Sequence, residues 1–355
     1  MTPPLTMTVY RPPGRLGSYV RAFQVFSAAQ PAGASVLDFG GGDVSVPVCF
    51  GDPVLVDGWR RAEVPSAAVV GPRRQAVWLR FQGTIDQVNI TFFPGAAGVF
   101  VGLAMPELVD GMAAPEDAWP GDFRQAVAEL EPLPTRQRIR GLAGLLLARL
   151  EPRRDPGPQV REAVRLIWAS RGQVTVRGLA GQVNLSVSQL ERSFTRHVGV
   201  GPKLLARQTR VSALAAEAMT QQRPGWAWLA AKYGYADQAH LTRDFRELTG
   251  LTPSGLAAER WPAGHGCRAG LPITWCHANL TCKTGSHESL STEEALTAAA
   301  LCSPSSAVPR RSGGRPAGGP EQAQAGRPAT RVCGQRADGG DSWPLARAGA
   351  LAAGR

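Results

Sequence analysis

The first 150 residues of the chain contain no histidine and only one cysteine, Cys49. The five histidines all come later, and they are His197, His240, His265, His277 and His287. Without histidine, this part of the chain cannot supply the ligand cluster of a histidine-rich metal site or the Ser/His/Asp or Cys/His arrangement of a nucleophilic enzyme. We therefore expect no metal, no cofactor and no catalytic residue there.

The remaining cysteines are also too poorly placed to stabilise a folded region. Five of the six follow residue 260, which excludes a disulfide framework for the preceding 260 residues. One late group could bind zinc in principle, and it consists of Cys267, Cys276, His277, Cys282 and His287. Its spacing matches no usual pairing of zinc ligands, so we predict no metal site in it.

Long hydrophobic runs are missing as well. The longest candidate, residues 142–150, is interrupted by Gly144 and Arg149. The N-terminus has no basic flank that leads into an apolar stretch, as a secretory signal would have. We expect a cytoplasmic protein that does not contact a membrane.

Positive charge is concentrated in the middle of the 355-residue chain. Residues 1–150 contain 13 Lys/Arg and 13 Asp/Glu, whereas residues 151–262 contain 16 and 9, and residues 263–355 contain 10 and 6. A basic block of this kind is typical of a surface that binds a polyanion such as DNA. A basic face that only contacts solvent is the alternative, and charge alone does not distinguish the two.

The first 120 residues show short apolar segments separated by Gly and Pro. The predicted strands are residues 19–26, 35–39, 44–50, 54–56, 67–70, 76–81, 87–93 and 98–101. Many short strands without intervening helices favour a small β-barrel or sandwich. Two helices are predicted next, over residues 122–131 and 135–151, the second with Thr135 as its N-cap.

Residues 152–158 contain three prolines and are predicted to be a linker. From residue 159 the pattern is helical, with helices expected from 159 to about 170 and over 176–183, 186–197, 203–222, 226–233 and 237–248. After residue 261 the composition changes to Gly, Ala, Pro, Arg and Ser, and residues 262–355 are predicted to be largely disordered. The fold class is therefore α+β, with a β-rich first domain and an all-α second domain.

An internal repeat lies within the basic block. The first copy is Leu190-Glu191-Arg192-Ser193-Phe194 with Gly199 and Pro202, and the second is Leu241-Thr242-Arg243-Asp244-Phe245 with Gly250 and Pro253. Matched positions are offset by 51 residues. In each copy a short helix, a tight turn and a second helix predict a helix-turn-helix unit.

Rotation by about 100° per residue divides each second helix into two faces. Val187, Leu190 and Phe194 form the predicted core side of the first helix, and Leu241 and Phe245 form that of the second. The opposite sides contain Ser188, Arg192, Thr195 and Arg196, and Ala239, Arg243 and Arg246. Arginine suits a bidentate contact with guanine or a contact with phosphate, and Gln238 and His240 lie at the helix end that enters a DNA groove.

The helix predicted over 203–222 separates the two units. At about 1.5 Å per residue it is roughly 28 Å long, which is close to one turn of B-DNA, about 34 Å. Two recognition helices joined in this way could enter successive major-groove segments on one face of the duplex. One chain would then make the contacts for which many such proteins require a dimer.

Residues 159–260 resemble the DNA-binding domain of the AraC/XylS transcriptional regulators of bacteria. The resemblance is carried by Leu179-Ala180, Leu185-Ser186, both repeat copies, Leu229-Ala230, Gly234-Tyr235 and Thr252-Pro253-Ser254. In that family a Gly-Phe pair is usual where this chain has Gly234-Tyr235. The resemblance implies promoter binding, with Ser188, Glu191 and Arg192, then Gln238, Ala239, His240 and Arg243, at the base-facing positions.

Residues 1–150 also resemble the N-terminal domain of some members of this family. The similarity rests on Tyr10-Arg11-Pro12-Pro13, Val36-Leu37-Asp38-Phe39, Phe93-Pro94-Gly95-Ala96-Ala97 and Glu107-Leu108-Val109-Asp110. It implies a sensing or dimerisation role and no particular ligand.

The sequence thus predicts a sequence-specific transcriptional regulator and not an enzyme. Its domains are residues 1–151 for sensing or dimerisation, the linker 152–158, the DNA-binding domain 159–261 and the tail 262–355. The expected partners are double-stranded promoter DNA, RNA polymerase if the protein is an activator, a small-molecule effector and a second copy of the chain. The predicted DNA-binding residues are Ser186, Ser188, Gln189, Glu191, Arg192, Thr195, Arg196, Gln238, Ala239, His240, Thr242, Arg243 and Arg246.

One alternative remains open. In it, residues 1–150 form a small-molecule-binding or enzymatic barrel, and the basic domain only localises this barrel on DNA.

Overall fold

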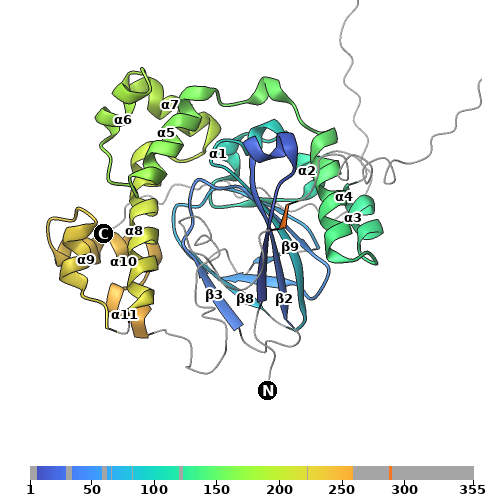
Figure 1. Cartoon of the computed structure of the whole chain (residues 1–355), viewed down its shortest axis with the longest axis horizontal. Helices are drawn as coiled ribbons and strands as arrows, with labels where there is room; N and C mark the ends of the chain where they lie inside the picture. Colours follow the sequence, from blue (N-terminus) through green and yellow to red (C-terminus); the bar gives the residue numbers. More distant parts are fainter. Residues whose placement is uncertain are drawn as a thin grey trace, which may run out of the picture.

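Two sheets and a set of helices make up the part of the chain that the computed structural model describes (Figure 1). This part consists of residues 6–28, 34–57, 62–64, 66–81, 83–119, 123–221, 223–258 and 288–289. All strands except β11 belong to the first 120 residues, and the helices after residue 150 form a separate layer beside the sheets. The predicted α+β fold class is confirmed.

The larger sheet has the strand order β10-β7-β4-β9-β2-β1-β11. Its strands are β1 (Thr6–Arg11), β2 (Val20–Ala28), β4 (Ser45–Cys49), β7 (Val69–Val70), β9 (Ile85–Phe92), β10 (Met112–Ala113) and β11 (Glu288–Ser289). Only β11 pairs in parallel, with β1, and all other pairs of this sheet are antiparallel. The sheet has two covered faces, so that β9 is buried along most of its length.

The smaller sheet has the order β3-β8-β5-β6 and packs against one face of the larger sheet. Its strands are β3 (Ala34–Asp38), β5 (Val54–Asp57), β6 (Ala62–Val64) and β8 (Val77–Phe81). Val56 and Phe81 of this sheet share a core with Phe26, Cys49 and Ile85 of the larger one. Two sheets with one core between them form the predicted sandwich.

Helices cover the other face of the larger sheet. They are η1 (Gly14–Ser18), η2 (Ala97–Val99), α1 (Met105–Leu108), α2 (Pro115–Ala118), α3 (Phe123–Leu130) and α4 (Thr135–Ala148). Phe23 and Ile90 of the sheet pack with Leu142 and Leu146 of α4 in one core. Apolar residues four positions apart on α4 therefore face the sheet, as their spacing predicts.

Several sequence-based expectations for this part are wrong in detail. Residues 98–101 do not form a strand, because the chain turns there through η2. Thr135 is not an N-cap, since it is the first residue of α4 and Pro134 precedes it in the cap position without a side-chain cap. Strands β1, β6, β10 and β11 were not predicted. The last three have only two or three residues, which is too few for an alternation of apolar and polar residues to show.

Residues 152–258 are helical. The elements are η3 (Pro152–Arg154), α5 (Pro158–Ala169), α6 (Val176–Gln182), α7 (Val187–His197), α8 (Pro202–Thr220), α9 (Trp226–Lys232), α10 (Gln238–Thr249) and α11 (Pro253–Ala258). The α6–α7 pair and the α9–α10 pair lie near opposite ends of α8 (Figure 1). This confirms two helix-turn-helix units joined by a long helix.

Each helix-turn-helix unit has its own core. In the first, Leu190 and Phe194 pack with Val160 and Ile167 of α5. In the second, Leu241 and Phe245 pack with Leu214 of α8. The pairs of apolar residues that the repeat placed on one helix face are buried as predicted.

The second core also includes residues from the β-rich part. Leu37 of β3 and Phe39 lie in the cluster that contains Leu241 and Phe245, and the rings of Phe39 and Phe245 meet edge to face with centroids 6.2 Å apart. In addition, the rings of Phe93 and Trp168 of α5 have centroids 5.8 Å apart. The β-rich and helical parts therefore pack tightly against each other, which the sequence did not predict.

The predicted disorder of residues 262–355 concerns residues outside the described part of the chain, apart from the two of β11. Among the described helices, none combines the length and the apolar character that crossing a membrane requires.

The shared core predicts that a residue of the β-rich part contributes to the stability of the second helix-turn-helix unit. Replacement of Phe39 by Ala should lower the free energy of unfolding by about 3 kcal/mol, since the ring is 3% exposed and leaves a cavity beside Phe245. Trp228→Ala is the control, because Trp228 is 55% exposed and its loss should cost less than about 1 kcal/mol. Denaturant unfolding measures both, and equal losses would show that Phe39 does not belong to this core.

Candidate nucleic-acid interface

Helix α7 begins at a capping box. The Oγ of Ser186 accepts a hydrogen bond from the backbone N–H of Gln189 at 3.2 Å, and the Gln189 side-chain oxygen accepts one from the Ser186 N–H at 2.9 Å. Both residues were predicted to contact DNA. Their side chains are exposed but already hold the first turn of α7, so they also determine where the helix begins.

Helix α10 begins at a different cap. The Asp237 side chain accepts a hydrogen bond from the His240 N–H at 2.6 Å. Gly250 ends the helix with φ +73°, a left-handed conformation that favours glycine. The Tyr235 ring, in the turn between α9 and α10, contacts the His240 ring edge to face with centroids 5.2 Å apart. This contact restrains His240 near the N-terminal end of the helix.

The predicted DNA-binding side chains lie on the solvent side of both helices. Twelve of the thirteen are exposed, and Thr242 is half-buried because its Oγ1 donates a hydrogen bond to the Gln238 carbonyl at 2.8 Å. The exposed residues are Ser186, Ser188, Gln189, Glu191, Arg192, Thr195, Arg196, Gln238, Ala239, His240, Arg243 and Arg246. Each helix therefore turns its polar face to the solvent and its Leu/Phe pair to the core on the opposite side.

Four arginines on these faces have no acidic partner among the described residues, and they are Arg192, Arg196, Arg243 and Arg246. Other arginines of the helical part are paired: Arg165 binds Glu162, and Arg207 binds Asp244 and Glu247. An exposed guanidinium without a carboxylate partner is available for a phosphate or a guanine edge without first breaking an ion pair.

Val187 was expected in the core, and this is wrong. It is 36% exposed and is the first residue of α7, directly after the Ser186 cap. Val187 is therefore an apolar member of the same exposed face, and the position next to the cap is the sequence signal that could have identified it.

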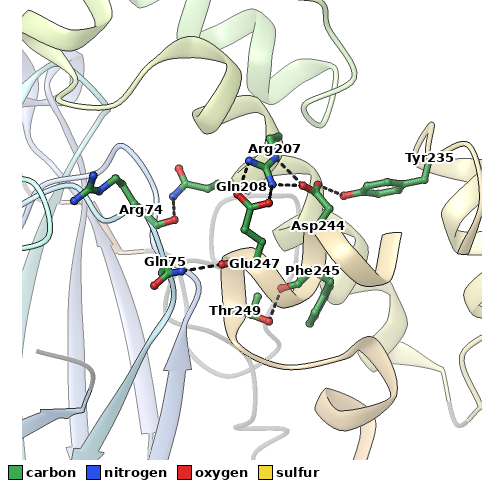
Figure 2. Close-up of polar contacts among 9 residues, drawn as sticks. All are labelled: Arg74, Gln75, Arg207, Gln208, Tyr235, Asp244, Phe245, Glu247 and Thr249. Atoms are coloured by element: carbon green, nitrogen blue, oxygen red, sulfur yellow. Dashed lines mark hydrogen bonds and ion pairs between the residues drawn. The ribbon is translucent and has the colours of Figure 1, made fainter. Parts of the chain in front are cut away.

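A polar network holds the inner side of α10 (Figure 2). Asp244 is buried, and its Oδ1 accepts a hydrogen bond from Arg207 Nε of α8 at 2.6 Å. The Tyr235 hydroxyl donates to Asp244 Oδ2 at 2.9 Å, and Arg207 also binds Glu247 with Nη2 2.7 Å from Oε2. The network attaches the recognition helix α10 to α8 through both of its acidic residues.

The electrostatics of the network favour the ionised pairs. The hydrogen bond from Arg207 to Glu247, followed by the bond to Asp244, raises the pKa of the guanidinium. Burial, followed by the negative charge of Asp244, raises the pKa of the Tyr235 phenol, which keeps it protonated as a donor. The same bond to Arg207 lowers the pKa of Glu247. Arg207, Tyr235 and Glu247 thus hold the charge states that their hydrogen bonds need at neutral pH.

The β-rich part offers no comparable reactive site among its described residues. Cys49 is its one cysteine, and burial raises the pKa of this thiol to about 12. Since the thiolate is the reactive form, Cys49 is a poor nucleophile at neutral pH. Among the described residues, no group of three or more His, Cys, Asp or Glu side chains is placed to hold a metal ion.

Residues 179–259 match the sequence model of a helix-turn-helix domain. This segment is an AraC-type helix-turn-helix domain. The matched residues run from α6 to the end of α11 and contain both recognition helices. An AraC-type domain supports a role as a DNA-binding transcription regulator. Among curated proteins, no sequence matches that of the chain.

Several solved structures show some similarity to the chain. The C-terminal domain of AraT, a response regulator from Geobacillus stearothermophilus, is 22% identical, with a TM-score of 0.28, and the match covers 31% of this chain and 96% of that one. ToxT from Vibrio cholerae is 10% identical, with a TM-score of 0.38, and the match covers 72% of this chain and 98% of that one. ToxT with a bound unsaturated fatty acid is 11% identical, with a TM-score of 0.35, and covers 72% and 95%.

Because the Asp244 carboxylate is buried, removal of its partner Arg207 should strongly lower the stability of the AraC-type domain. Arg207→Met should lower the free energy of unfolding by about 2–3 kcal/mol, because it leaves Asp244 buried with only the Tyr235 hydroxyl. Adding Asp244→Asn should recover part of this loss, since the buried group is then neutral.

Arg165→Ala is the matched control in α5. Arg165 forms its ion pair with Glu162 at the surface, where the arginine side chain is 62% exposed, so its loss should change the free energy of unfolding much less than Arg207→Met does. Chemical denaturation of the variants gives the comparison. A similar loss for Arg165→Ala and Arg207→Met would contradict a special role for the buried pair.

Proposed function

We propose that the protein is a sequence-specific transcriptional regulator that inserts α7 and α10 into successive major-groove segments of a promoter. The observation that carries this proposal is the pair of exposed faces, each with unpaired arginines opposite a buried Leu/Phe pair. Helix α8, with 19 residues, is about 28 Å long. This length is near one turn of B-DNA, about 34 Å. It supports an arrangement in which both recognition helices contact the same side of the duplex.

In this proposal the two recognition helices read different bases. Helix α7 offers Arg192 for guanine or phosphate, Ser188 and Glu191 for base edges, and the exposed Val187 for a thymine methyl group. Helix α10 offers Gln238 and Arg243, together with His240 held by the Tyr235 ring. Since the side chains differ, the two half-sites should not be identical.

The β-rich part has a regulatory role in this proposal. We assign residues 1–151 to sensing or dimerisation, 152–158 to a linker, 159–261 to the DNA-binding domain and 262–355 to a tail. RNA polymerase is a further partner if the protein activates transcription. A small-molecule effector and a second copy of the chain are the partners that this role implies.

The arginines provide the direct test. Arg192→Ala and Arg243→Ala should each weaken binding to the operator by about 1–3 kcal/mol and relax specificity at the base that each contacts. The operator is first identified by genome-wide mapping of the bound sites. Binding is then measured at one salt concentration, because the contribution of phosphate contacts depends on salt.

Arg124→Ala is the control for the loss of one positive charge. Arg124 is an exposed arginine of α3, in the β-rich part, and is paired with Glu116. Its replacement should leave operator affinity unchanged. Operator binding as tight as that of the wild type by both Arg192→Ala and Arg243→Ala would show that α7 and α10 do not read the groove.

A further inference from the structure

One short segment of the β-rich part contacts both helix-turn-helix units. It consists of residues 72–76, between β7 and β8, and is called the bracing segment here. The Arg73 side chain forms an ion pair with the buried Asp38, and the Arg74 N–H donates to Asp110 Oδ1 at 2.7 Å. These bonds attach the bracing segment to the end of β3 on one side and to the α1–β10 turn on the other.

The first contact of the bracing segment is with α8. Gln208, which is 4% exposed, donates hydrogen bonds from Nε2 to the carbonyl of Arg73 at 2.6 Å and to that of Arg74 at 3.2 Å (Figure 2). Gln208 directly follows Arg207, which binds Asp244 of α10. The β-rich part is therefore bonded to α8 next to the residue that attaches α8 to the recognition helix.

The second contact is with the last turn of α10. The Gln75 side chain donates to the Glu247 carbonyl at 3.0 Å, and the Ala76 N–H donates to the Leu248 carbonyl at 2.8 Å. These carbonyls lie at the C-terminal end of α10, where helix carbonyls lack partners within the helix. The bracing segment thus caps the second recognition helix from outside its own unit.

The third contact is with the turn after α7. A Cβ on Gly199 would lie 3.1 Å from Pro72 Cγ, so the bracing segment closely approaches the first unit. The glycine turn before β4 approaches the same place, since a Cβ on Gly42 would lie 2.6 Å from Val198 Cγ1. Both helix-turn-helix units are therefore held by adjacent parts of one rigid surface.

None of these contacts covers the proposed DNA-binding faces. The predicted DNA-binding side chains of α10 are exposed apart from the half-buried Thr242. On this helix the bracing segment hydrogen-bonds only to the main-chain carbonyls of Glu247 and Leu248. On α7 the contact begins after the helix has ended. The packed arrangement is thus compatible with access of DNA to both helices.

We propose that the bracing segment fixes the orientation of the second helix-turn-helix unit relative to the first, so that both recognition helices are pre-organised for one operator. This proposal rests on the proposed function, because it assumes that each helix-turn-helix unit binds one of two half-sites. A unit already held in place loses less conformational freedom on binding, so the restraint increases affinity for the complete operator. It does not affect an operator that engages only one unit.

The test removes the side-chain donors and keeps the shapes similar. Gln208→Met removes both bonds to the bracing segment, and Gln75→Ala removes the bond to the Glu247 carbonyl. The double variant in the full chain should bind the complete operator about tenfold more weakly than wild type, in line with the net contribution of a few hydrogen bonds. On an operator whose second half-site is scrambled, the two proteins should bind equally.

The matched control is the double variant Gln125→Ala and Thr209→Val. Gln125 donates a hydrogen bond to Glu129 at the surface of α3, and Thr209 donates one to the Leu205 carbonyl within α8, so these side-chain bonds do not involve the bracing segment. The single variant Gln75→Ala should fold normally, because this side chain is exposed. It should show a smaller loss of affinity for the complete operator than the double variant. Unchanged or tighter binding of the complete operator, or an equal loss on both operators, would overturn the proposal.

A measurement without DNA separates this inference from the proposed function. Amide hydrogen exchange in the last turn of α10 should become roughly tenfold faster in the Gln75→Ala and Gln208→Met double variant, while exchange in α7 stays unchanged. Equal exchange rates in α10 of the wild type and the double variant would refute the role proposed for the bracing segment. Wild-type protein that binds the complete and the scrambled operator equally would instead refute the two-helix reading.

Discussion

The ion pair between Arg207 and Asp244 is the interaction on which the arrangement of the helical part depends. It joins the N-terminal third of α8 to the inner face of the second recognition helix, and the Tyr235 hydroxyl donates a further hydrogen bond to the carboxylate. A buried carboxylate is stable only where its partners are correctly placed. The pair therefore allows few orientations of α10 on α8, and this in turn determines where the outer face of α10 points.

The same region is where the β-rich part meets the helical part. Phe39 completes the apolar core of the second unit, and the main chain of residues 73–76 bonds to α8 and α10 close to Arg207. The apolar contact supplies stability without direction, whereas the hydrogen bonds specify one register between the two parts. A change in the β-rich part would thus reach the second recognition helix through a few identified atoms.

Much of the two recognition helices was predictable, because the signals are local. Ser186 and Asp237 start the helices as caps, and their bonds involve residues three positions further on. The apolar residues at spacings of four in each copy of the repeat face a core, as an amphipathic helix requires. Val187 shows the limit of this reasoning, since its place on the helical wheel suggested burial but its side chain is 36% exposed.

The sequence by itself determined the helices, their caps and the separation of arginines from the Leu/Phe pairs, because these depend on residues within one or two helical turns of each other. The tertiary structure alone decided that Asp244 pairs with Arg207, 37 residues away, and that Gln208 bonds to Arg73, 135 residues away. A pattern within a helix shows that a side chain is buried but not which distant element buries it. For that reason the repeat identified the candidate DNA-binding faces, whereas the surface that holds them together became visible only in the folded chain.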